Sequence, residues 1–272
     1  MASTIRRRVS PAWRWRTNDL YGRFFVFGNK KSIASFSQYS YLYPIWNING
    51  PANVQGTAQR TEVNVKLIVL GATGGTGLEI VRQATERGHL VTALVRSPDR
   101  LEQFLNRITV KQGDLLNSAD LQQAIPGHDA VVSAFGPRVP ISKDDGNLLQ
   151  RFAVALTRAM PHTEVRRVVV ESVAFLFKDS VLPPAYLLGR LLFPRTVADA
   201  SAMEQVFAES ELDWTMVRPP QLTDKPYTGK YRVREGHLPL FGFKISRADV
   251  ADFMLKAAEN HASSRKVVGV CN

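Results

Sequence analysis

From residue 65 onward, the apolar positions of the chain follow two alternating patterns. Short runs of branched apolar residues, typical of strands buried on both faces of a sheet, alternate with stretches whose apolar residues recur at helical intervals. The predicted strands are Val65–Leu70, His89–Val95, Ile108–Lys111, Asp129–Ala134, Val165–Val170, Trp214–Val217 and Val267–Val270. The predicted helices are Leu78–Arg87, a short one ending near Asn106, Leu115–Ile125, Gly146–Met160, Ala198–Ser210 and Arg247–Ala258, the last capped by Ser246. This order predicts an α/β fold with a doubly wound parallel sheet.

A glycine-rich loop separates the first predicted strand from the first predicted helix. Its glycines are Gly71, Gly74, Gly75 and Gly77. Such a loop turns sharply, lets backbone N–H groups approach a pyrophosphate, and sets the phosphates at a positive helix N-terminus. Thr73 and Thr76 can add hydroxyl hydrogen bonds to a phosphate. The pattern therefore predicts dinucleotide binding by a Rossmann fold; the alternative is a tight turn that only packs the helix onto the strand.

The end of the second strand carries the signal for the form of the dinucleotide. An acid at this place binds the ribose 2′-hydroxyl of NAD, whereas arginine accommodates the 2′-phosphate of NADP. Here Arg96 follows the strand and Arg100 lies one helical turn further on, with Ser97 as an additional donor. The sequence therefore favours NADP(H). The alternative is that both arginines are solvated, with Asp99 neutralising one of them.

The positive charge of the chain is concentrated near its start. Residues 1–60 hold nine Arg or Lys and a single acid, a net charge of +8, which leaves only +3 of the total of +11 for the rest. A body of nearly balanced charge argues against a dedicated nucleic-acid-binding module. We expect an extension over residues 1–62, either a targeting segment, a mis-started upstream segment or a disordered tail, followed by one domain over 63–272 with a small substrate-binding C-terminal part. From composition alone, a role of the extension at a nucleic acid or a membrane surface stays open.

Cysteine content and hydropathy bear on the compartment. Cys271 is the only cysteine, so neither an intrachain disulfide nor a cysteine zinc site can form, and a reducing compartment fits. No apolar run reaches the roughly 18–20 residues that a membrane-spanning helix needs. We expect a cytoplasmic protein, or a mitochondrial or plastid one if the basic extension is a transit peptide.

Several motifs in one order resemble the atypical short-chain dehydrogenases/reductases. They are GATGGTG at 71–77, LVRSPDRL at 94–101, GDLL at 113–116, VVSAFGPR at 131–138, ESVAFLF at 171–177, DWTMVRPPQLTDKPYTGKYRV at 213–233 and ISRADVADFML at 245–255. The chain is similar there to the NAD(P)H-binding, NmrA-like group, and within it to the biliverdin reductase B and flavin reductase type. The likeness runs from about Val65 to Leu255.

This resemblance implies a role for each residue along the cofactor. The pyrophosphate would be held by Gly71, Thr73, Gly74, Gly75 and Thr76, and the 2′-phosphate by Arg96 and Arg100. Asp114 and Leu115 would flank the adenine, although Asp114 could instead be only a helix cap. Beside the nicotinamide ribose would lie Phe135, Gly136 and Arg138. Pro220, Gln221 and Leu222 would close over the nicotinamide, although the two prolines at 219 and 220 could be only a rigid strand exit.

The candidate catalytic residue is Ser172, at the end of the fifth predicted strand. The wider superfamily combines such a serine with Tyr-x-x-x-Lys, but here Tyr186 is followed by Arg190, so Tyr186 is the weaker candidate. The reductases that the chain resembles need no such triad, because hydride passes to an electron-poor ring and the proton can come from solvent. Their histidines appear here as Ala200 and Gln221, which leaves a pyrrole substrate in doubt.

The resemblance implies an NADPH-dependent oxidoreductase acting on a small conjugated acceptor such as a flavin or quinone. The acceptor pocket would be shaped by residues Val181 to Thr196 and Thr223–Tyr231. The alternative is a non-catalytic NADP(H)-binding regulator of the NmrA-like type, which reads redox state for a protein partner. The five histidines lie without metal-ligand spacing, and a solvated loop is expected at Asp144 and Asp145, so we expect no metal site. We expect Asp249 and Asp252 to be structural.

Overall fold

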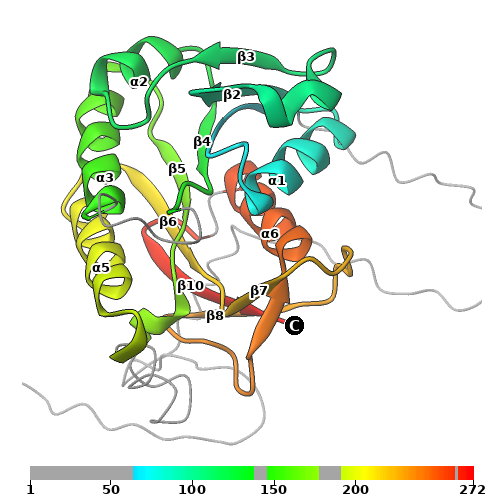
Figure 1. Ribbon diagram of the computed structural model, residues 1–272, viewed down its shortest axis with the longest axis vertical. Helices are drawn as coiled ribbons and strands as arrows, with labels where there is room; N and C mark the ends of the chain where they lie inside the picture. Colours follow the sequence, from blue (N-terminus) through cyan, green and yellow to red (C-terminus); the bar gives the residue numbers. More distant parts are fainter. Residues whose placement is uncertain (1–63, 138–145, 178–190, 261–262) are drawn as a thin grey trace, which may run out of the picture. The chain divides into compact units, whose positions relative to one another are not determined.

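The computed structural model describes residues 64–137, 146–177, 191–260 and 263–272. An eight-stranded sheet has the order β3-β2-β1-β4-β5-β6-β10-β8, and its pairings are parallel except for the edge strand β8, which runs antiparallel to β10 (Figure 1). The strands are β1 (Lys66–Leu70), β2 (Leu90–Val95), β3 (Thr109–Gln112), β4 (Ala130–Ser133), β5 (Arg167–Glu171), β6 (Asp213–Arg218), β8 (Arg232–Glu235) and β10 (Lys266–Cys271). A separate parallel pair consists of β7 (Gln221–Thr223) and β9 (Lys244–Ser246).

Helices cover both faces of the sheet. The α-helices are α1 (Gly75–Glu86), α2 (Ser118–Ala124), α3 (Leu148–Ala159), α5 (Pro194–Ala208) and α6 (Arg247–Glu259), with 3-10 turns η1 (Asp99–Phe104), η3 (Met160–His162) and η4 (Ala174–Leu176). Figure 1 shows α1 and α6 side by side on one face, and α2, α3 and α5 on the other. The predicted doubly wound fold is confirmed. Its strand order reverses between β1 and β4, where folds of this kind bind their ligands.

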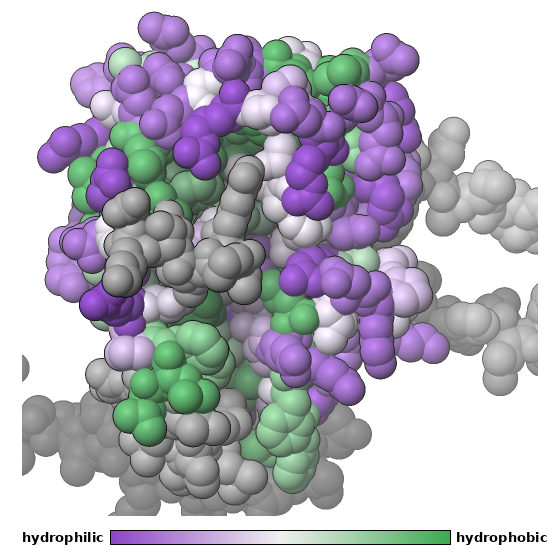
Figure 2. Space-filling view, viewed as in Figure 1, coloured by the Kyte–Doolittle hydropathy of each residue, from purple (hydrophilic) through white to green (hydrophobic). Residues whose placement is uncertain are grey.

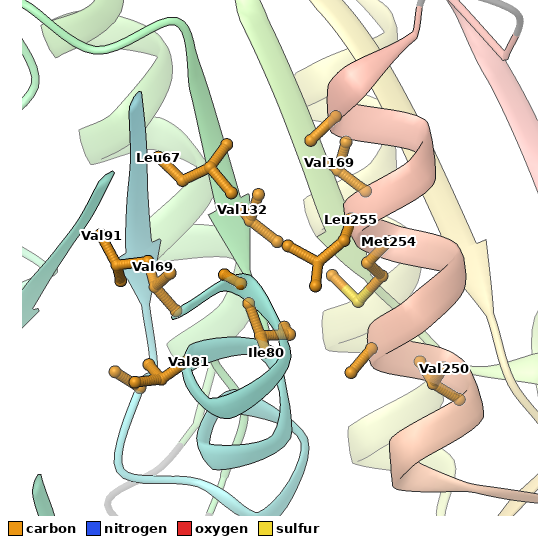
Figure 3. Close-up of a cluster of buried hydrophobic side chains, with 14 of the residues drawn as sticks. Leu67, Val69, Ile80, Val81, Val91, Val132, Val169, Val250, Met254 and Leu255 are labelled. Carbon is orange, nitrogen blue, oxygen red and sulfur yellow. The ribbon is translucent and has the colours of Figure 1, made fainter. Parts of the chain in front are cut away.

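The continuous apolar strands are explained by burial on both faces. Leu67 and Val69 of β1 belong to the core beneath α1 and α6, whereas Ile68 and Leu70 face the core beneath α2, α3 and α5. Figure 3 shows the first of these cores, where Ile80 of α1 approaches the sheet residues. All five side chains are fully buried. Alternate residues of one strand thus stabilise both helix layers.

Several helices and strands depart from the sequence prediction. The helix expected over Leu115–Ile125 begins only at Ser118, because the Asn117 side chain accepts a hydrogen bond from Ala119 N at 2.9 Å and caps it there. The helix expected from Ala198 begins earlier, at Pro194. Strands β7, β8 and β9 were not predicted: they have three or four residues each, and every residue of β8 is exposed, so no apolar alternation marks it.

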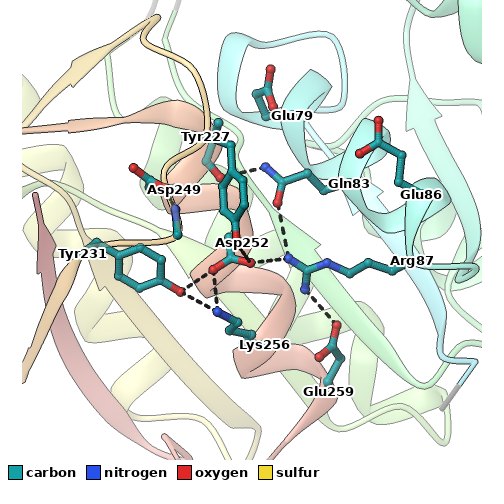
Figure 4. Close-up of polar contacts among 12 residues, drawn as sticks. Glu79, Gln83, Glu86, Arg87, Tyr227, Tyr231, Asp249, Asp252, Lys256 and Glu259 are labelled. Carbon is teal, nitrogen blue, oxygen red and sulfur yellow. Dashed lines mark hydrogen bonds and ion pairs between the residues drawn. The ribbon is translucent and has the colours of Figure 1, made fainter. Parts of the chain in front are cut away.

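Two buried carboxylates of α6 hold neighbouring segments in place. Asp249 accepts hydrogen bonds from Thr228 N and Gly229 N, both at 2.9 Å, and from Asn272 Nδ2, also at 2.9 Å. Asp252 joins α6 to α1 and to the segment before β8, as Figure 4 shows. These contacts agree with the structural role expected for both. Ser246 caps α6 as predicted, accepting from Asp249 N at 3.0 Å.

Among the described residues, no helix is long and apolar enough to cross a membrane.

Candidate cofactor site

The glycine loop lies at the carboxyl end of β1, and the backbone around Gly71 and Gly77 leaves no room for a side chain at these two positions. Gly71 has a φ of +77°, and a Cβ there would lie 2.7 Å from Phe135 N. A Cβ on Gly77 would lie 2.1 Å from the Gly71 carbonyl oxygen. Gly74 N donates to that same oxygen at 2.9 Å. The loop is therefore a compact backbone cradle that only glycine permits at these positions.

The start of α1 is open to an anion. Its cap residue, Gly74, has no side chain that could accept from the N–H groups of the first turn, and no acid lies in that turn. The positive end of the helix dipole and its N–H groups are thus left for an external partner. Thr73 is partly exposed on the loop, and Gly75 is exposed at the first helical position. The cradle and the helix end fit the pyrophosphate of a dinucleotide.

Thr76 directs its hydroxyl to a carboxylate that the sequence analysis missed. The buried Thr76 Oγ1 donates to Glu171 Oε1 at 3.3 Å. Glu171 is the last residue of β5 and largely buried, and this burial raises its pKa to about 7, against the opposing effects of the Thr76 hydrogen bond and the nearby Arg247 charge. The signal was present in the sequence, since Glu171 is an acid at the end of an apolar run.

Of the two predicted 2′-phosphate residues, Arg100 contacts this loop directly. Arg100, in η1, donates from Nη1 to the Thr73 carbonyl oxygen at 2.7 Å. Arg96 follows β2 and is exposed. Within the described part of the chain neither arginine forms an ion pair, so Asp99 does not neutralise one of them there. Both guanidiniums are available to a phosphate.

The predicted adenine residues follow β3. Asp114 accepts from Leu116 N at 3.1 Å, and its own N–H donates to Asp120 Oδ2 at 2.8 Å. Asp114 is therefore not the cap of α2, a position that Asn117 takes. Leu115 is buried in the core beneath α2 and α3.

The predicted nicotinamide residues lie after β4 and β6. The Phe135 ring centroid lies 5.0 Å from that of Phe152, and a Cβ on Gly136 would meet open space. Gln221 N donates to the Phe243 carbonyl oxygen at 3.2 Å. Pro220 and Leu222 are partly buried. Arg138 lies outside the described residues.

Ser172 belongs to a buried polar cluster. Its Oγ donates to Glu204 Oε1 at 2.5 Å, and Arg218 Nε donates to the same oxygen at 2.9 Å. The Arg218 guanidinium also lies over the Phe177 ring, 4.5 Å from its centroid. The Ser172 hydroxyl is thus engaged inside the protein, and no local sequence pattern indicates Glu204 as its partner. Tyr186 and Arg190 lie outside the described residues.

Two histidines of the described residues, His89 and His128, form hydrogen bonds to neighbouring side chains. His89 Nε2 lies 2.9 Å from Glu259 Oε1, and His128 Nε2 lies 2.8 Å from Thr92 Oγ1. No three His, Cys, Asp or Glu side chains in the described ranges could hold a metal ion together. Asp144 and Asp145 lie outside those ranges.

Several large apolar side chains before α5 and before β9 are exposed. Figure 2 shows hydrophobic side chains at the lower end of the face it presents, whereas the upper part is largely hydrophilic. These exposed apolar side chains are those of Leu191, Leu192 and Phe193 directly before α5, and of Leu240, Phe241 and Phe243 before β9. An apolar surface of this kind suits contact with a conjugated ring.

Known proteins share the sequence pattern and the fold. The sequence model of a family described as NAD(P)H-binding matches residues 71–261. An uncharacterized chloroplastic protein of Arabidopsis thaliana is 30% identical over 225 residues, which cover 79% of this chain and 80% of the relative. A short-chain dehydrogenase/reductase of Veillonella parvula, solved in complex with NADP, has a TM-score of 0.64 at 21% identity and covers 76% of this chain and 95% of its own. A candidate NADH-flavin reductase of Streptococcus pneumoniae has a TM-score of 0.64 at 24% identity, with coverages of 77% and 100%.

Proposed function

The chain belongs to the NAD(P)H-binding family, and on that premise we propose that it is an NADPH-dependent oxidoreductase that reduces a small conjugated acceptor such as a flavin or quinone. Family membership confirms the predicted nicotinamide dinucleotide cofactor. The observation that carries the proposal is the pairing of a side-chain-free cradle at Gly71 and Gly77 with two arginines that have no acid partner in the described chain.

The preference for the 2′-phosphorylated cofactor rests on Arg96 and Arg100. A phosphate dianion is bound most strongly by planar guanidiniums, which offer paired N–H groups. Arg100 already lies at the glycine loop through its 2.7 Å hydrogen bond to the Thr73 carbonyl oxygen. The pyrophosphate would be held by Gly71, Thr73, Gly74, Gly75 and Thr76, with Asp114 and Leu115 beside the adenine.

The chemistry requires little from the protein beyond orientation. When bound, NADPH supplies a hydride, and a flavin or quinone that accepts it needs one further proton, which solvent can provide. Phe135, Pro220 and Leu222 would exclude water around the ring. The Ser172 hydroxyl donates to Glu204 and so holds the residues after β5 in place. We therefore assign Ser172 a positioning role and not a catalytic one in the absence of substrate. Proximity and orientation then supply most of the rate.

The finer likeness to the biliverdin reductase B and flavin reductase type is part of this proposal. The Streptococcus pneumoniae neighbour, a candidate NADH-flavin reductase, supports a flavin as acceptor. Ala200 is fully buried in α5, and Gln221 stands at the start of β7, where the resembling reductases have histidines. A flavin or quinone is therefore the preferred acceptor class over a pyrrole.

The engagement of Ser172 also favours a second candidate, a non-catalytic NADP(H)-binding regulator of the NmrA-like type. A hydroxyl held 2.5 Å from Glu204 Oε1 is not free to donate to a substrate. In that case the cofactor's redox state would be passed to a protein partner.

We also propose an organellar location, with the plastid as the first choice over the cytoplasm. The 30% identical relative is chloroplastic, and residues 1–60 carry a net charge of +8. Import of the full chain into isolated plastids, with shortening by about 60 residues, would support this; exclusion from them would refute it.

The rate of NADPH oxidation catalysed by the full chain, measured at steady state with each of a panel of flavins and quinones as acceptor, distinguishes the reductase from the regulator. The reductase predicts turnover with at least one acceptor. Cofactor binding without turnover on any acceptor would contradict it and favour the regulator.

A further inference from the structure

The side chain of Arg247 lies against the first residue of α1. A Cβ on Gly75 would lie 2.7 Å from both Cδ and Nε of Arg247, so the arginine fills the space that a side chain at Gly75 would need. Arg247 is the first residue of α6, fixed there by the Ser246 cap. A cation from α6 is thus held at the same helix end where the cradle offers its N–H groups.

Two carboxylates interact with this guanidinium. Arg247 Nη1 lies 2.5 Å from Asp224 Oδ1, directly after β7. On the inner side, the charge of Arg247 lowers the pKa of Glu171, whose carboxylate accepts from Thr76. Arg247 therefore interacts with a largely buried acid of the site, Glu171, and forms an ion pair with an exposed acid at its rim, Asp224.

The partner at the rim can be exchanged at little cost. The Asp224 side chain is 90% exposed, whereas that of Arg247 is only 28% exposed. A pair with one solvated member contributes little to stability, because water screens the attraction and hydrates the released carboxylate. A pyrophosphate at a helix N-terminus offers several charged oxygens that a guanidinium can bind through paired hydrogen bonds.

We propose that Arg247 is a further cofactor-binding residue, which exchanges Asp224 for the pyrophosphate of the dinucleotide. This inference rests on the proposed cofactor site. Arg247 then recognises the part that NADP and NAD share, whereas Arg96 and Arg100 recognise the 2′-phosphate. Release of Asp224 also connects cofactor binding to the segment 224–230, which borders the expected acceptor pocket.

Calorimetric titration of the full chain with NADPH, NADH, ADP-ribose and adenosine 2′-monophosphate tests the exchange. Arg247→Gln is expected to raise the dissociation constants of NADPH, NADH and ADP-ribose on the order of tenfold, and to leave that of adenosine 2′-monophosphate unchanged, since it lacks the pyrophosphate. Arg247→Lys keeps the charge and is expected to give an intermediate loss. Asp224→Asn removes the carboxylate partner of Arg247 and is expected to lower the dissociation constants of NADPH, NADH and ADP-ribose.

The matched control is Arg82→Gln on α1, because Arg82 also pairs with carboxylates, those of Glu79 and Glu86, but within its own helix. It is expected to change no dissociation constant. If Arg247→Gln fails to fold, the Asp224→Asn titration decides alone. Unchanged binding in Arg247→Gln, or weaker binding in Asp224→Asn, overturns the inference. Absence of NADPH binding by the unaltered chain would instead overturn the proposed function.

Discussion

Arg87 Nη2 lies 2.5 Å from Asp252 Oδ1 and forms an ion pair that joins α1 to α6. The carboxylate is 3% exposed and also accepts from Tyr231 Oη at 2.5 Å and Lys256 Nζ at 2.7 Å (Figure 4). Burial and Asp252 raise the pKa of Tyr231, so this phenol stays a proton donor. The pair lies at the far end of α1 from the glycine loop, so it sets the orientation of the helix whose first turn forms the cradle.

Asp252→Asn is expected to destabilise the protein by about 2–4 kcal/mol, because the amide leaves two cations without their buried counter-charge. The free energy of unfolding in urea measures this. Glu86→Gln is the matched control: it removes an exposed partner of Arg82 and should cost less than about 0.5 kcal/mol. Equal effects of the two variants would show that the Asp252 cluster does not stabilise the helix pair.

Gly77→Ala is expected to disrupt the cradle. Its Cβ would lie 2.1 Å from the Gly71 carbonyl oxygen, a backbone atom that cannot move aside without reshaping the loop. We expect a loss of several kcal/mol, about 2–4, together with loss of cofactor binding. Gly136→Ala meets no atom within 4 Å and should leave the unfolding free energy unchanged. Urea unfolding of both variants checks this, and a stable Gly77→Ala protein would contradict it.

Arg96→Ala is expected to raise the dissociation constant of NADPH at least about tenfold relative to that of NADH, because one charge-assisted hydrogen bond to the phosphate contributes about 1.5–3 kcal/mol of binding free energy. Arg100→Ala should weaken both cofactors, because its guanidinium also holds the Thr73 carbonyl oxygen. Calorimetric dissociation constants for the two variants separate these effects. An unchanged ratio of NADPH to NADH affinity in Arg96→Ala would refute the 2′-phosphate assignment.

Glu171 predicts a specific pH dependence of stability. Its pKa is raised from 4.5 to about 7 by burial, so the folded protein binds more protons than the unfolded chain between these values. The contribution of the Glu171 carboxyl to the free energy of unfolding is therefore fully present below pH 4.5 and is lost as the pH rises to about 7. Relative to Glu171→Gln, the unaltered chain should lose up to about 3 kcal/mol between pH 5 and pH 8. A difference that stays constant with pH would show that Glu171 does not titrate there.

The sequence predicted what depends on local pattern. Strand, glycine loop and helix follow one another within residues 65–87, so the order of β1, the cradle and α1 could be inferred from spacing, although α1 begins at Gly75 and not at the predicted Leu78. Arg96 was proposed as a cofactor residue in the same way, from its place after the second strand, and this role stays a prediction. The fold class followed from the repeated alternation of two periods.

Contacts between distant segments could not be predicted. Thr76 and Glu171 are 95 positions apart, and Ser172 and Glu204 are 32 apart. Their meeting depends on strand order and on how α1 and α5 pack on the sheet, neither of which leaves a local signal. The sequence marked Arg247 only as the first residue of a predicted helix within a matching motif, because its nearness to Gly75 exists only after α6 packs beside α1.

The most direct test of the central claim is a single turnover without oxygen. The full chain is mixed with an equal amount of NADPH, flavin mononucleotide is added, and the absorbance at the nicotinamide band is followed against a protein-free sample. The account predicts rapid loss of the reduced nicotinamide signal together with bleaching of the flavin, only when the protein is present. Bound NADPH that stays reduced at the protein-free rate, with flavins and then with quinones, would contradict the reductase.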